Sequence, residues 1–370
     1  MEKNLYPQLE IDLKKLESNI NEIVRRCGEK GVGVAGVIKG FNGLIECTKV
    51  YAKSGCKFIA SSRREQLEEA RKAGIDMPMM MIRVPMLSEA AEIVRIADIS
   101  LNSDVKVLRA LDAEAKKQGK THEVILMADL GDLREGFWDK TELLRAALLV
   151  ENELANLKLM GVGTNLGCYG SIAATVDKME ELIACAESIE KEIGRKLDYI
   201  SGGATTSLPR IVEDNMPARI NQLRVGEGII LGRDLQTLWG YDMSYLYTDA
   251  FTLKAEVIEV EDKPSHPVGE IMFDAFGNEP VYEDRGMRKK ALLGLGKVDY
   301  AFPDKIFPRE AGIEILGASS DHTILDITEL GREITTGDIL EFDICYASIV
   351  YVTSSQNIKI VMINQEGDLQ

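Results

Sequence analysis

The sequence predicts an α/β protein in which an N-terminal (β/α)8 TIM barrel is followed by a C-terminal all-β domain. In the first two-thirds of the 370 residues, short apolar runs alternate with segments of helical periodicity. Near-continuous apolar strands that are joined by helical crossovers indicate a parallel sheet buried on both faces. Eight such units favour a closed barrel, with an open doubly wound sheet as the alternative. We expect residues 8–235 to form the barrel and residues 236–370 the β domain, joined also by residues 1–7.

The expected barrel elements follow one another in a regular order. Three helical segments have clear ends, because residues 64–73, 103–117 and 176–193 are each closed by a following glycine, a natural residue at that position. Eight apolar runs are the expected barrel strands: residues 34–38, 57–61, 78–82, 97–101, 123–128, 157–162, 197–200 and 222–225.

Past residue 235 the helical periods give way to short alternating runs that are divided by turns rich in Gly, Asp and Pro. This pattern predicts β-strands at residues 251–260, 291–295, 313–316, 323–327, 339–342 and 358–363.

Composition excludes several classes of protein. The formal net charge of −16 opposes binding to nucleic acid or to an anionic membrane, because both need a basic surface. No apolar run reaches membrane-spanning length, and the start of the chain lacks a signal-peptide pattern. The six cysteines are scattered and the three histidines form no metal-binding motif. We therefore expect a cytoplasmic protein with reduced thiols, no dedicated metal site, no nucleic-acid partner and no membrane anchor.

Lys39 is the first residue to which the pattern assigns chemistry. It directly follows the first expected barrel strand, and the carboxyl ends of barrel strands carry the active site. Behind an apolar strand its ammonium would be partly desolvated, which lowers the pKa and gives an amine that can form a Schiff base.

Two glycine-rich loops close the expected barrel. Residues 201–206 follow the seventh strand, and residues 224–228 follow the eighth. Loops at these two positions form the usual phosphate site of such barrels, since glycine lets backbone N–H groups approach phosphate oxygens. A lysine after the first strand and phosphate loops after the last two are the layout expected for pyridoxal 5'-phosphate.

With these features in place, the chain resembles the alanine racemase family of pyridoxal-phosphate enzymes (fold type III). The resemblance runs in order over nearly the whole chain. Within the family, the sequence resembles the amino-acid racemases assigned to ornithine more than true alanine racemases. The resemblance is carried by Asn19 and by residues 7–13, 36–40, 129–137, 161–165, 224–226 and 252–258.

The resemblance implies a role for each matched residue. Lys39 would bind the cofactor and act as one racemisation base, and Arg224 would face the pyridine nitrogen. Arg134 would lie near the phenolic oxygen of the cofactor, and Asn165 against its ring. The phosphate would be held by Thr205 and Thr206 and by the backbone of Gly203, Ala204 and Gly226.

The chain also departs from the family pattern. Asn165 stands where alanine racemases have a histidine, and Met127 where they have a lysine. The second catalytic residue, a tyrosine from the partner subunit, should fall near residues 268–270, where this chain has none. Candidates for the acid/base on the opposite face are Glu270, His322 and Tyr346.

We therefore expect a homodimeric, pyridoxal-phosphate-dependent isomerase that interconverts L- and D-amino acids by two-base proton exchange at Cα, with ornithine as the expected substrate. The alternatives are a racemase of alanine or another amino acid, or a dehydratase, aldolase or decarboxylase on the same barrel. A protein that only holds the cofactor is a third alternative, which residues 236–370 argue against.

Overall fold

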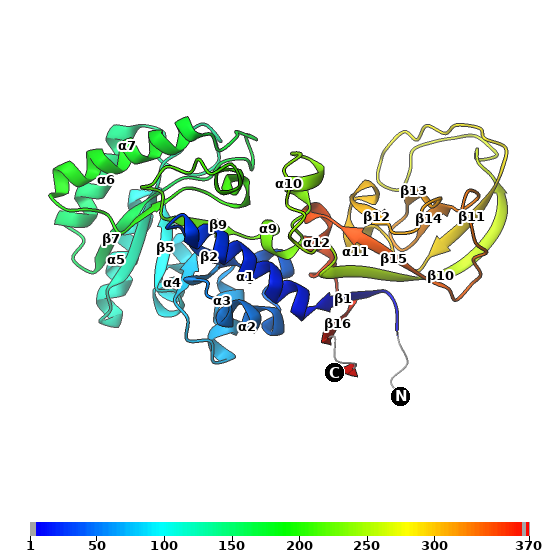
Figure 1. Ribbon diagram of the computed structural model, residues 1–370, viewed down its shortest axis with the longest axis horizontal. Helices are drawn as coiled ribbons and strands as arrows, with labels where there is room; N and C mark the ends of the chain where they lie inside the picture. Colours follow the sequence, from blue (N-terminus) through cyan, green and yellow to red (C-terminus); the bar gives the residue numbers. More distant parts are fainter. Residues whose placement is uncertain (1–4, 365–367, 370) are drawn as a thin grey trace. The chain divides into compact units, whose positions relative to one another are not determined.

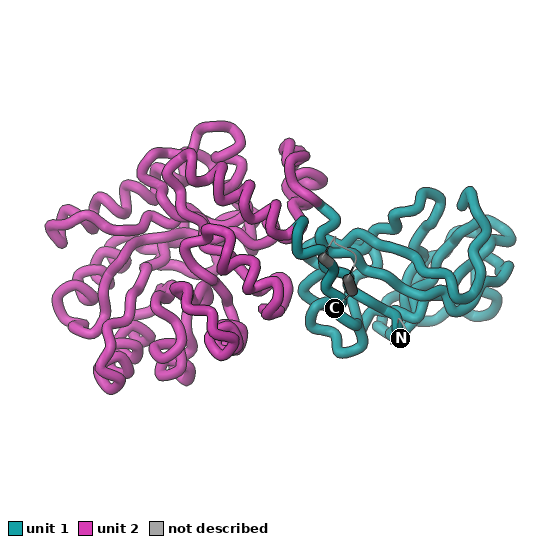
Figure 2. The backbone as a smooth tube through the Cα atoms, turned by 60° about the horizontal axis from the view of Figure 1, so that its bottom comes forward, with its two compact units in different colours: residues 1–15, 248–370 teal, residues 16–247 magenta. Residues whose placement is uncertain are grey.

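The computed structural model describes residues 5–364, 368 and 369, so the expected joining segment 1–7 lies partly outside the described residues. The chain forms two compact units (Figure 2). The barrel unit comprises residues 16–247, and the β unit comprises residues 1–15 and 248–370.

The barrel unit contains a closed parallel barrel of eight strands, β2 to β9 (Figure 1). Pairing of β2 with β9, for example Gly33 with Gln222, closes the ring. The predicted barrel is therefore confirmed, and the open sheet is excluded. Its strands are β2 (Gly33–Val37), β3 (Phe58–Ser61), β4 (Met79–Met81), β5 (Ile99–Asn102), β6 (His122–Met127), β7 (Leu157–Gly163), β8 (Tyr199–Ser201) and β9 (Gln222–Val225).

Helices surround the barrel, and local signals set their ends. The Asp104 carboxylate caps α5 by accepting the N–H groups of Lys106 and Val107, and Gly119 ends the helix in the left-handed conformation. The long helices are α1 (Leu13–Glu29), α2 (Ile45–Lys53), α3 (Arg64–Lys72), α4 (Ala90–Ile96), α5 (Val105–Gln118), α6 (Lys140–Asn152) and α7 (Val176–Ile193). The short ones are η1 (Lys39–Phe41), η2 (Leu87–Glu89), η3 (Thr205–Ser207), α8 (Pro209–Val212), α9 (Glu227–Ile230) and α10 (Asp234–Thr237).

The interior of the barrel is filled with side chains, as expected for this fold. One buried cluster contains residues from successive strands, among them Val37, Phe58, Leu101, Met127 and Met160. Because the middle of the barrel is packed, the loops at the carboxyl ends of the strands are the place for a site.

The β unit is a nine-stranded sheet built from both ends of the chain. Strand β1 pairs antiparallel with β10 and parallel with β16. The strands are β1 (Gln8–Asp12), β10 (Phe251–Pro264), β11 (Met287–Leu293), β12 (Ile306–Pro308), β13 (Glu314–Ala318), β14 (Thr323–Asp326), β15 (Ile339–Ile344), β16 (Lys359–Asn364) and β17 (Asp368–Leu369). The helical turns of the unit are α11 (Lys297–Tyr300), η4 (Pro303–Lys305) and α12 (Tyr346–Val352).

The unit boundaries differ from the expected 8–235 and 236–370. Residues 8–12 belong to the sheet of the β unit, because β1 hydrogen-bonds to β10 and β16. Residues 236–247 belong to the barrel unit. One tie is Asn19 of α1, whose amide nitrogen donates to the Ile229 and Tyr247 carbonyls while its oxygen accepts the Tyr247 N–H.

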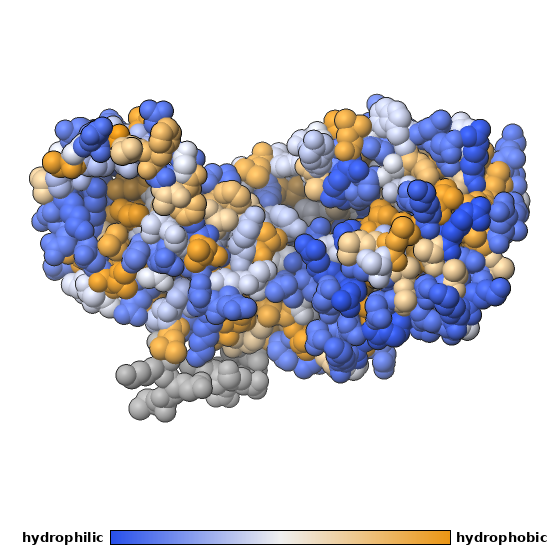
Figure 3. Space-filling view, turned by 180° about the vertical axis from the view of Figure 1, so that it is seen from behind, coloured by the Kyte–Doolittle hydropathy of each residue, from blue (hydrophilic) through white to orange (hydrophobic). Residues whose placement is uncertain are grey.

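The surface agrees with the charged composition. Hydrophilic residues cover most of the face of the barrel unit seen in Figure 3, with apolar residues scattered between them. Among the residues that the structure describes, no helix has the length and apolar character needed to cross a membrane.

Candidate functional site at the carboxyl ends of the barrel strands

Lys39 lies two residues beyond the end of β2, in the short turn η1. The turn ends at Asn42, which adopts the left-handed conformation with φ 53°. Burial lowers the pKa of the Lys39 ammonium, and the positive charge of Arg134 lowers it further. The structure therefore places a partly buried amine at the carboxyl end of the barrel strands, and its lowered pKa makes the neutral form more populated than in an exposed lysine.

Arg224 is a fixed, buried cation at the same end of the barrel. It lies on β9, is 4 % exposed, and donates to the Ser201 hydroxyl and, at 2.7 Å, to the Thr164 carbonyl. Burial lowers the pKa of Arg224 to about 10, so the side chain remains protonated at neutral pH. A guanidinium only donates, so a ring nitrogen that faced it would have to accept.

Arg134 belongs to the loop that follows β6. Its guanidinium binds both oxygens of the Glu135 carboxylate and donates to the Cys168 sulfur at 2.8 Å. Burial opposes its charge, but the hydrogen bond to Glu135 raises the pKa of Arg134 above its usual range. Met127 stands where the family pattern has a lysine, and it is fully buried in the barrel interior. In this chain the acid that binds Arg134 is Glu135.

The turns after β8 and β9 form one cradle. The Thr205 hydroxyl oxygen accepts the N–H groups of Gly226 at 3.4 Å and Gly228 at 3.1 Å, so its own hydrogen stays available for a ligand. Gly203 has φ +114°, and a Cβ there would lie 2.5 Å from the Ser207 hydroxyl. Ala204 precedes η3 in extended conformation.

Thr206 makes a different contact from its neighbour. Its hydroxyl donates to the Leu166 carbonyl, at 2.6 Å, and so ties η3 to the loop after β7. The hydrogen of this hydroxyl is thus already used, although its oxygen can still accept. The predicted phosphate contact of Thr206 stays a prediction.

Asn165 provides a test of whether a ligand belongs here. Its side-chain nitrogen is buried and, among the described residues, has no hydrogen-bond partner. Such orphaned groups are rare in proteins and call for an explanation, such as a ligand. The residues fit pyridoxal phosphate: Lys39 offers an amine, the Thr205 hydroxyl offers a donor beside the cradle, and Arg224 offers a fixed cation.

The three candidates for the second acid/base belong to the β unit. Glu270 is exposed in the segment between β10 and β11. His322 is exposed in the turn between β13 and β14, where its ring nitrogen contacts the Ser319 hydroxyl at 3.4 Å. Tyr346 is the first residue of α12 and is half-buried. Their catalytic role stays a prediction.

Sequence reasoning missed Glu135 and Cys168 as parts of the site, and it placed Ser201 in the loop 201–206 without predicting its contact with Arg224. Glu135 could have been found, because an acid directly after Arg134 can pair with it. Nothing in the sequence separates Cys168 from the other five cysteines, but the structure buries those five and exposes Cys168. The Ser201 contact with Arg224 needs the pairing of β8 with β9, which no local pattern shows.

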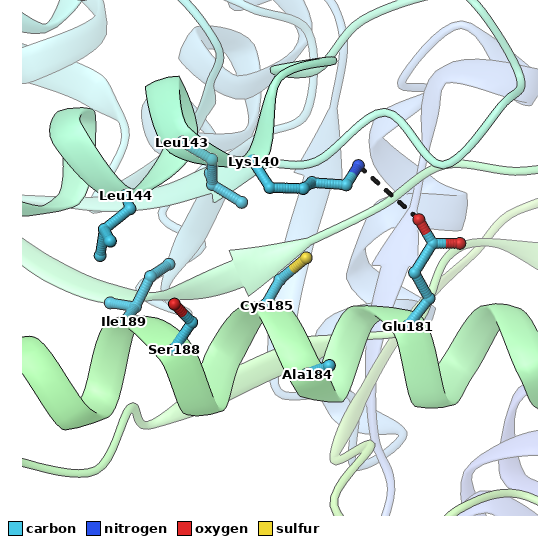
Figure 4. A pocket seen from close by; sticks show the side chains of 8 residues that line it. All are labelled: Lys140, Leu143, Leu144, Glu181, Ala184, Cys185, Ser188 and Ile189. Atoms are coloured by element: carbon cyan, nitrogen blue, oxygen red, sulfur yellow. Dashed lines mark ion pairs between the residues drawn. The ribbon is translucent and has the colours of Figure 1, made fainter.

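A separate pocket lies between α6 and α7 on the outer layer of the barrel (Figure 4). Lys140 and Glu181 form an ion pair at its edge, with 3.8 Å between nitrogen and oxygen. The Lys140 ammonium also donates to the Asp129 carbonyl at 2.7 Å, which fixes the start of the loop that carries Arg134.

A closed parallel barrel joined to a β-strand unit, with a lysine after the first barrel strand, defines a class of barrel enzymes. Comparison with known protein families identifies this class. The chain belongs to the alanine racemase family: the model of the family's N-terminal domain matches residues 11–234. The expectation of an isomerase of the amino-acid racemase type is confirmed.

Curated relatives match the chain almost from end to end. It is 37 % identical over 355 residues to an ornithine racemase of Acetoanaerobium sticklandii, covering 96 % of this chain and 99 % of the relative. It is 36 % identical to a lysine racemase of Thermotoga maritima, covering 95 % of this chain and 97 % of the relative. A solved alanine racemase of Clostridium difficile 630 matches with a TM-score of 0.74 at 17 % identity, covering 100 % and 98 % of the two chains, which shows the shared fold.

Proposed function

We propose that this protein is a pyridoxal-phosphate-dependent racemase of a diamino acid, with ornithine as the first substrate to test. The observation that carries the proposal is the partly buried Lys39 amine, whose pKa is lowered by burial and by Arg134, at the mouth of the barrel. The ornithine and lysine racemases among the relatives support a substrate with two amino groups.

Bound at this site, the cofactor would supply an electron sink that acidifies the Cα–H of an amino acid. The Thr205 hydroxyl and the backbone of residues 203, 204 and 226 would hold its phosphate, with Thr206 as a further predicted contact. Arg224 would face the ring nitrogen. Because an arginine gives up no proton at neutral pH, it keeps the ring a weaker sink, which favours simple proton exchange.

Lys39 would remove or return the proton on one face of Cα. Racemisation needs a second acid/base on the other face, since the proton must leave one side and arrive at the other. Glu270, His322 and Tyr346 remain the candidates, and we propose that the group comes from the partner in a homodimer. The six free thiols are consistent with the proposed cytoplasmic location.

The decisive experiment is exchange of the Cα hydrogen in deuterated water, with both enantiomers of ornithine, lysine and alanine. Lys39→Ala should abolish exchange and the visible absorption of the lysine-bound cofactor, because it removes the amine. Lys49→Ala, on the exposed side of α2, is the control and should behave as the wild type. Exchange at the wild-type rate in Lys39→Ala would contradict the proposal, and ammonia or aldehyde release would favour the alternatives.

The same assay identifies the second base. We expect one of Glu270→Gln, His322→Gln and Tyr346→Phe to retain exchange with one enantiomer and lose it with the other. Loss of the group on one face blocks abstraction from that face only, whereas a structural defect slows both enantiomers alike. If all three variants exchange both enantiomers at wild-type rates, none of them is the second base.

A further inference from the structure

Asp132 is a buried acid in the loop after β6, yet its carboxylate binds a different loop. Among the described residues it accepts N–H groups only from the loop after β7. These are Cys168 at 3.2 Å and Tyr169 at 3.1 Å, with a longer contact to Ile172 at 3.5 Å. Hydrogen bonds to an ionised carboxylate are stronger than those between neutral groups. The Asp132 side chain therefore joins two loops.

The loop that carries Asp132 is shaped by another acid. The Asp129 carboxylate accepts the N–H groups of Gly131 at 2.8 Å and Leu133 at 3.2 Å. The Asp129 carbonyl in turn accepts the Lys140 ammonium. The turn that leads to Arg134 thus has its own support and does not need the Asp132 carboxylate.

The loop after β7 is packed against its neighbours on both sides. A Cβ at Gly170 would lie 2.6 Å from the Asp132 carbonyl oxygen, so only glycine fits at this contact. A Cβ at Gly167 would lie 2.6 Å from the Thr206 side chain. The Asp132 carboxylate is the anchor on the Arg134 side, and Thr206 is the anchor on the other.

We propose that Asp132 is a positioning residue of the site, whose carboxylate holds the β7 loop so that Cys168 stays against Arg134. The Arg134 guanidinium donates to the Cys168 sulfur, and the Cys168 N–H is one of the groups that Asp132 binds. Both groups lie close enough to Lys39 to change its pKa: the charge of Arg134 lowers it, and Cys168 raises it. The consequence for turnover rests on the proposed racemase function, whereas the consequence for the loop does not.

The test uses the holoenzyme and the backbone amides of Cys168 and Tyr169, which donate to Asp132. Asp132→Asn keeps the size of the side chain but removes its charge and turns a donor toward N–H groups. Hydrogen–deuterium exchange of these two amides, followed by peptide mass spectrometry, should become about tenfold faster as the loop opens more often. The kcat for racemisation should fall about tenfold to a hundredfold, more than KM changes, because the site is misplaced.

Asp139→Asn is the matched control. Asp139 lies at the end of the same loop, is exposed, and accepts the Thr141 N–H at 2.7 Å as the cap of α6; within the described part of the chain its carboxylate has no hydrogen bond to the β7 loop. It should leave both readouts at wild-type values. Gly170→Ala presses the loops apart without changing the carboxylate, so it carries the test if Asp132→Asn does not fold.

Wild-type amide exchange rates at Cys168 and Tyr169 in both Asp132→Asn and Gly170→Ala would overturn the inference, as would an equal increase in Asp139→Asn. Faster amide exchange with an unchanged kcat would also overturn it, since Asp132 would then serve only the loop. Faster amide exchange in a protein that has no racemase activity would support the loop anchor and contradict the proposed function.

Discussion

Arg224 and His122 are both buried in the barrel unit, but at neutral pH the first is charged and the second is not. Burial lowers both pKa values, to about 10 for Arg224 and to about 4 for His122. Arg224 therefore stays a cation that donates to Ser201, and His122 stays neutral with its ring against the Ser100 hydroxyl at 2.8 Å. Burial thus leaves a charge beside the site and removes one from the β5–β6 contact.

His122 should make the protein less stable in mild acid. Its pKa is near 6.5 in the unfolded chain and about 4 when folded, so between these values the unfolded state binds the extra proton. The contribution of His122 to the unfolding free energy is fully present above pH 6.5. It falls by about 3 kcal/mol in total as the pH decreases toward 4. Urea denaturation across this range should show a smaller loss of unfolding free energy in His122→Gln than in the wild type.

The control for this experiment is His266→Gln, because His266 lies outside the barrel unit, between β10 and β11, where its ring contacts the Pro267 carbonyl and the edge of the Tyr282 ring. Its pH dependence should match that of the wild type. Equal slopes for His122→Gln and the wild type would show that another group governs acid stability.

The position of Lys39 could be predicted from sequence, because a residue after an apolar strand has a fixed place at the mouth of a barrel. The partners of Arg134 could not. They depend on how the loops after β6 and β7 meet, and the order of residues within one loop does not encode that contact.

At the level of elements, β7 and β8 show how close approach of strands depends on glycine. A Cβ at Gly161 would lie 2.1 Å from the Tyr199 carbonyl oxygen, so Gly161→Ala forces the two strands apart. We expect it to cost at least about 3 kcal/mol of unfolding free energy, or to prevent folding. Urea denaturation, or the soluble yield when the variant does not fold, measures the effect.

Gly28→Ala should have the opposite effect. Gly28 lies near the end of α1 and a Cβ there would meet nothing within 4 Å. Alanine in a helix should therefore raise the unfolding free energy by up to about 1 kcal/mol. If the two alanine variants are equally stable, the close pairing of β7 with β8 is not what requires glycine.

All eight barrel strands could be predicted from their apolar runs, because strands buried on both faces have a strong and local signal. Strand β12, of three residues, was not predicted, since a strand so short carries almost no pattern. The place of β1 was also missed. Residues 8–12 were assigned to the barrel, because the partners of β1, β10 and β16, lie hundreds of residues away in the sequence.

At the level of the whole molecule, the proposed dimer must form between two chains that each carry a charge of −16. The β unit has exposed apolar side chains between β10 and β11, including Val268, Met272, Phe273 and Val281. We expect light scattering to give a mass of twice 40.9 kDa. Because salt screens the repulsion between like charges, the dimer should dissociate more readily at about 10 mM than at about 150 mM ionic strength.

Racemase activity per chain should decrease on dilution in parallel with the mass, since the second acid/base is proposed to come from the partner. A monomer that retains full activity at every concentration would contradict both the dimer and the shared site.

The pairing of β1 with β16 has a consequence for synthesis of the chain. The barrel unit is one uninterrupted stretch that is complete once residue 247 has left the ribosome. The β unit is discontinuous, because its first strand emerges at the start and waits for a parallel partner at residues 359–364. In chain order, the barrel unit lies between β1 and the rest of the β unit. During translation the barrel unit can therefore fold first, while β1 stays unpaired until β10 and then β16 have been made.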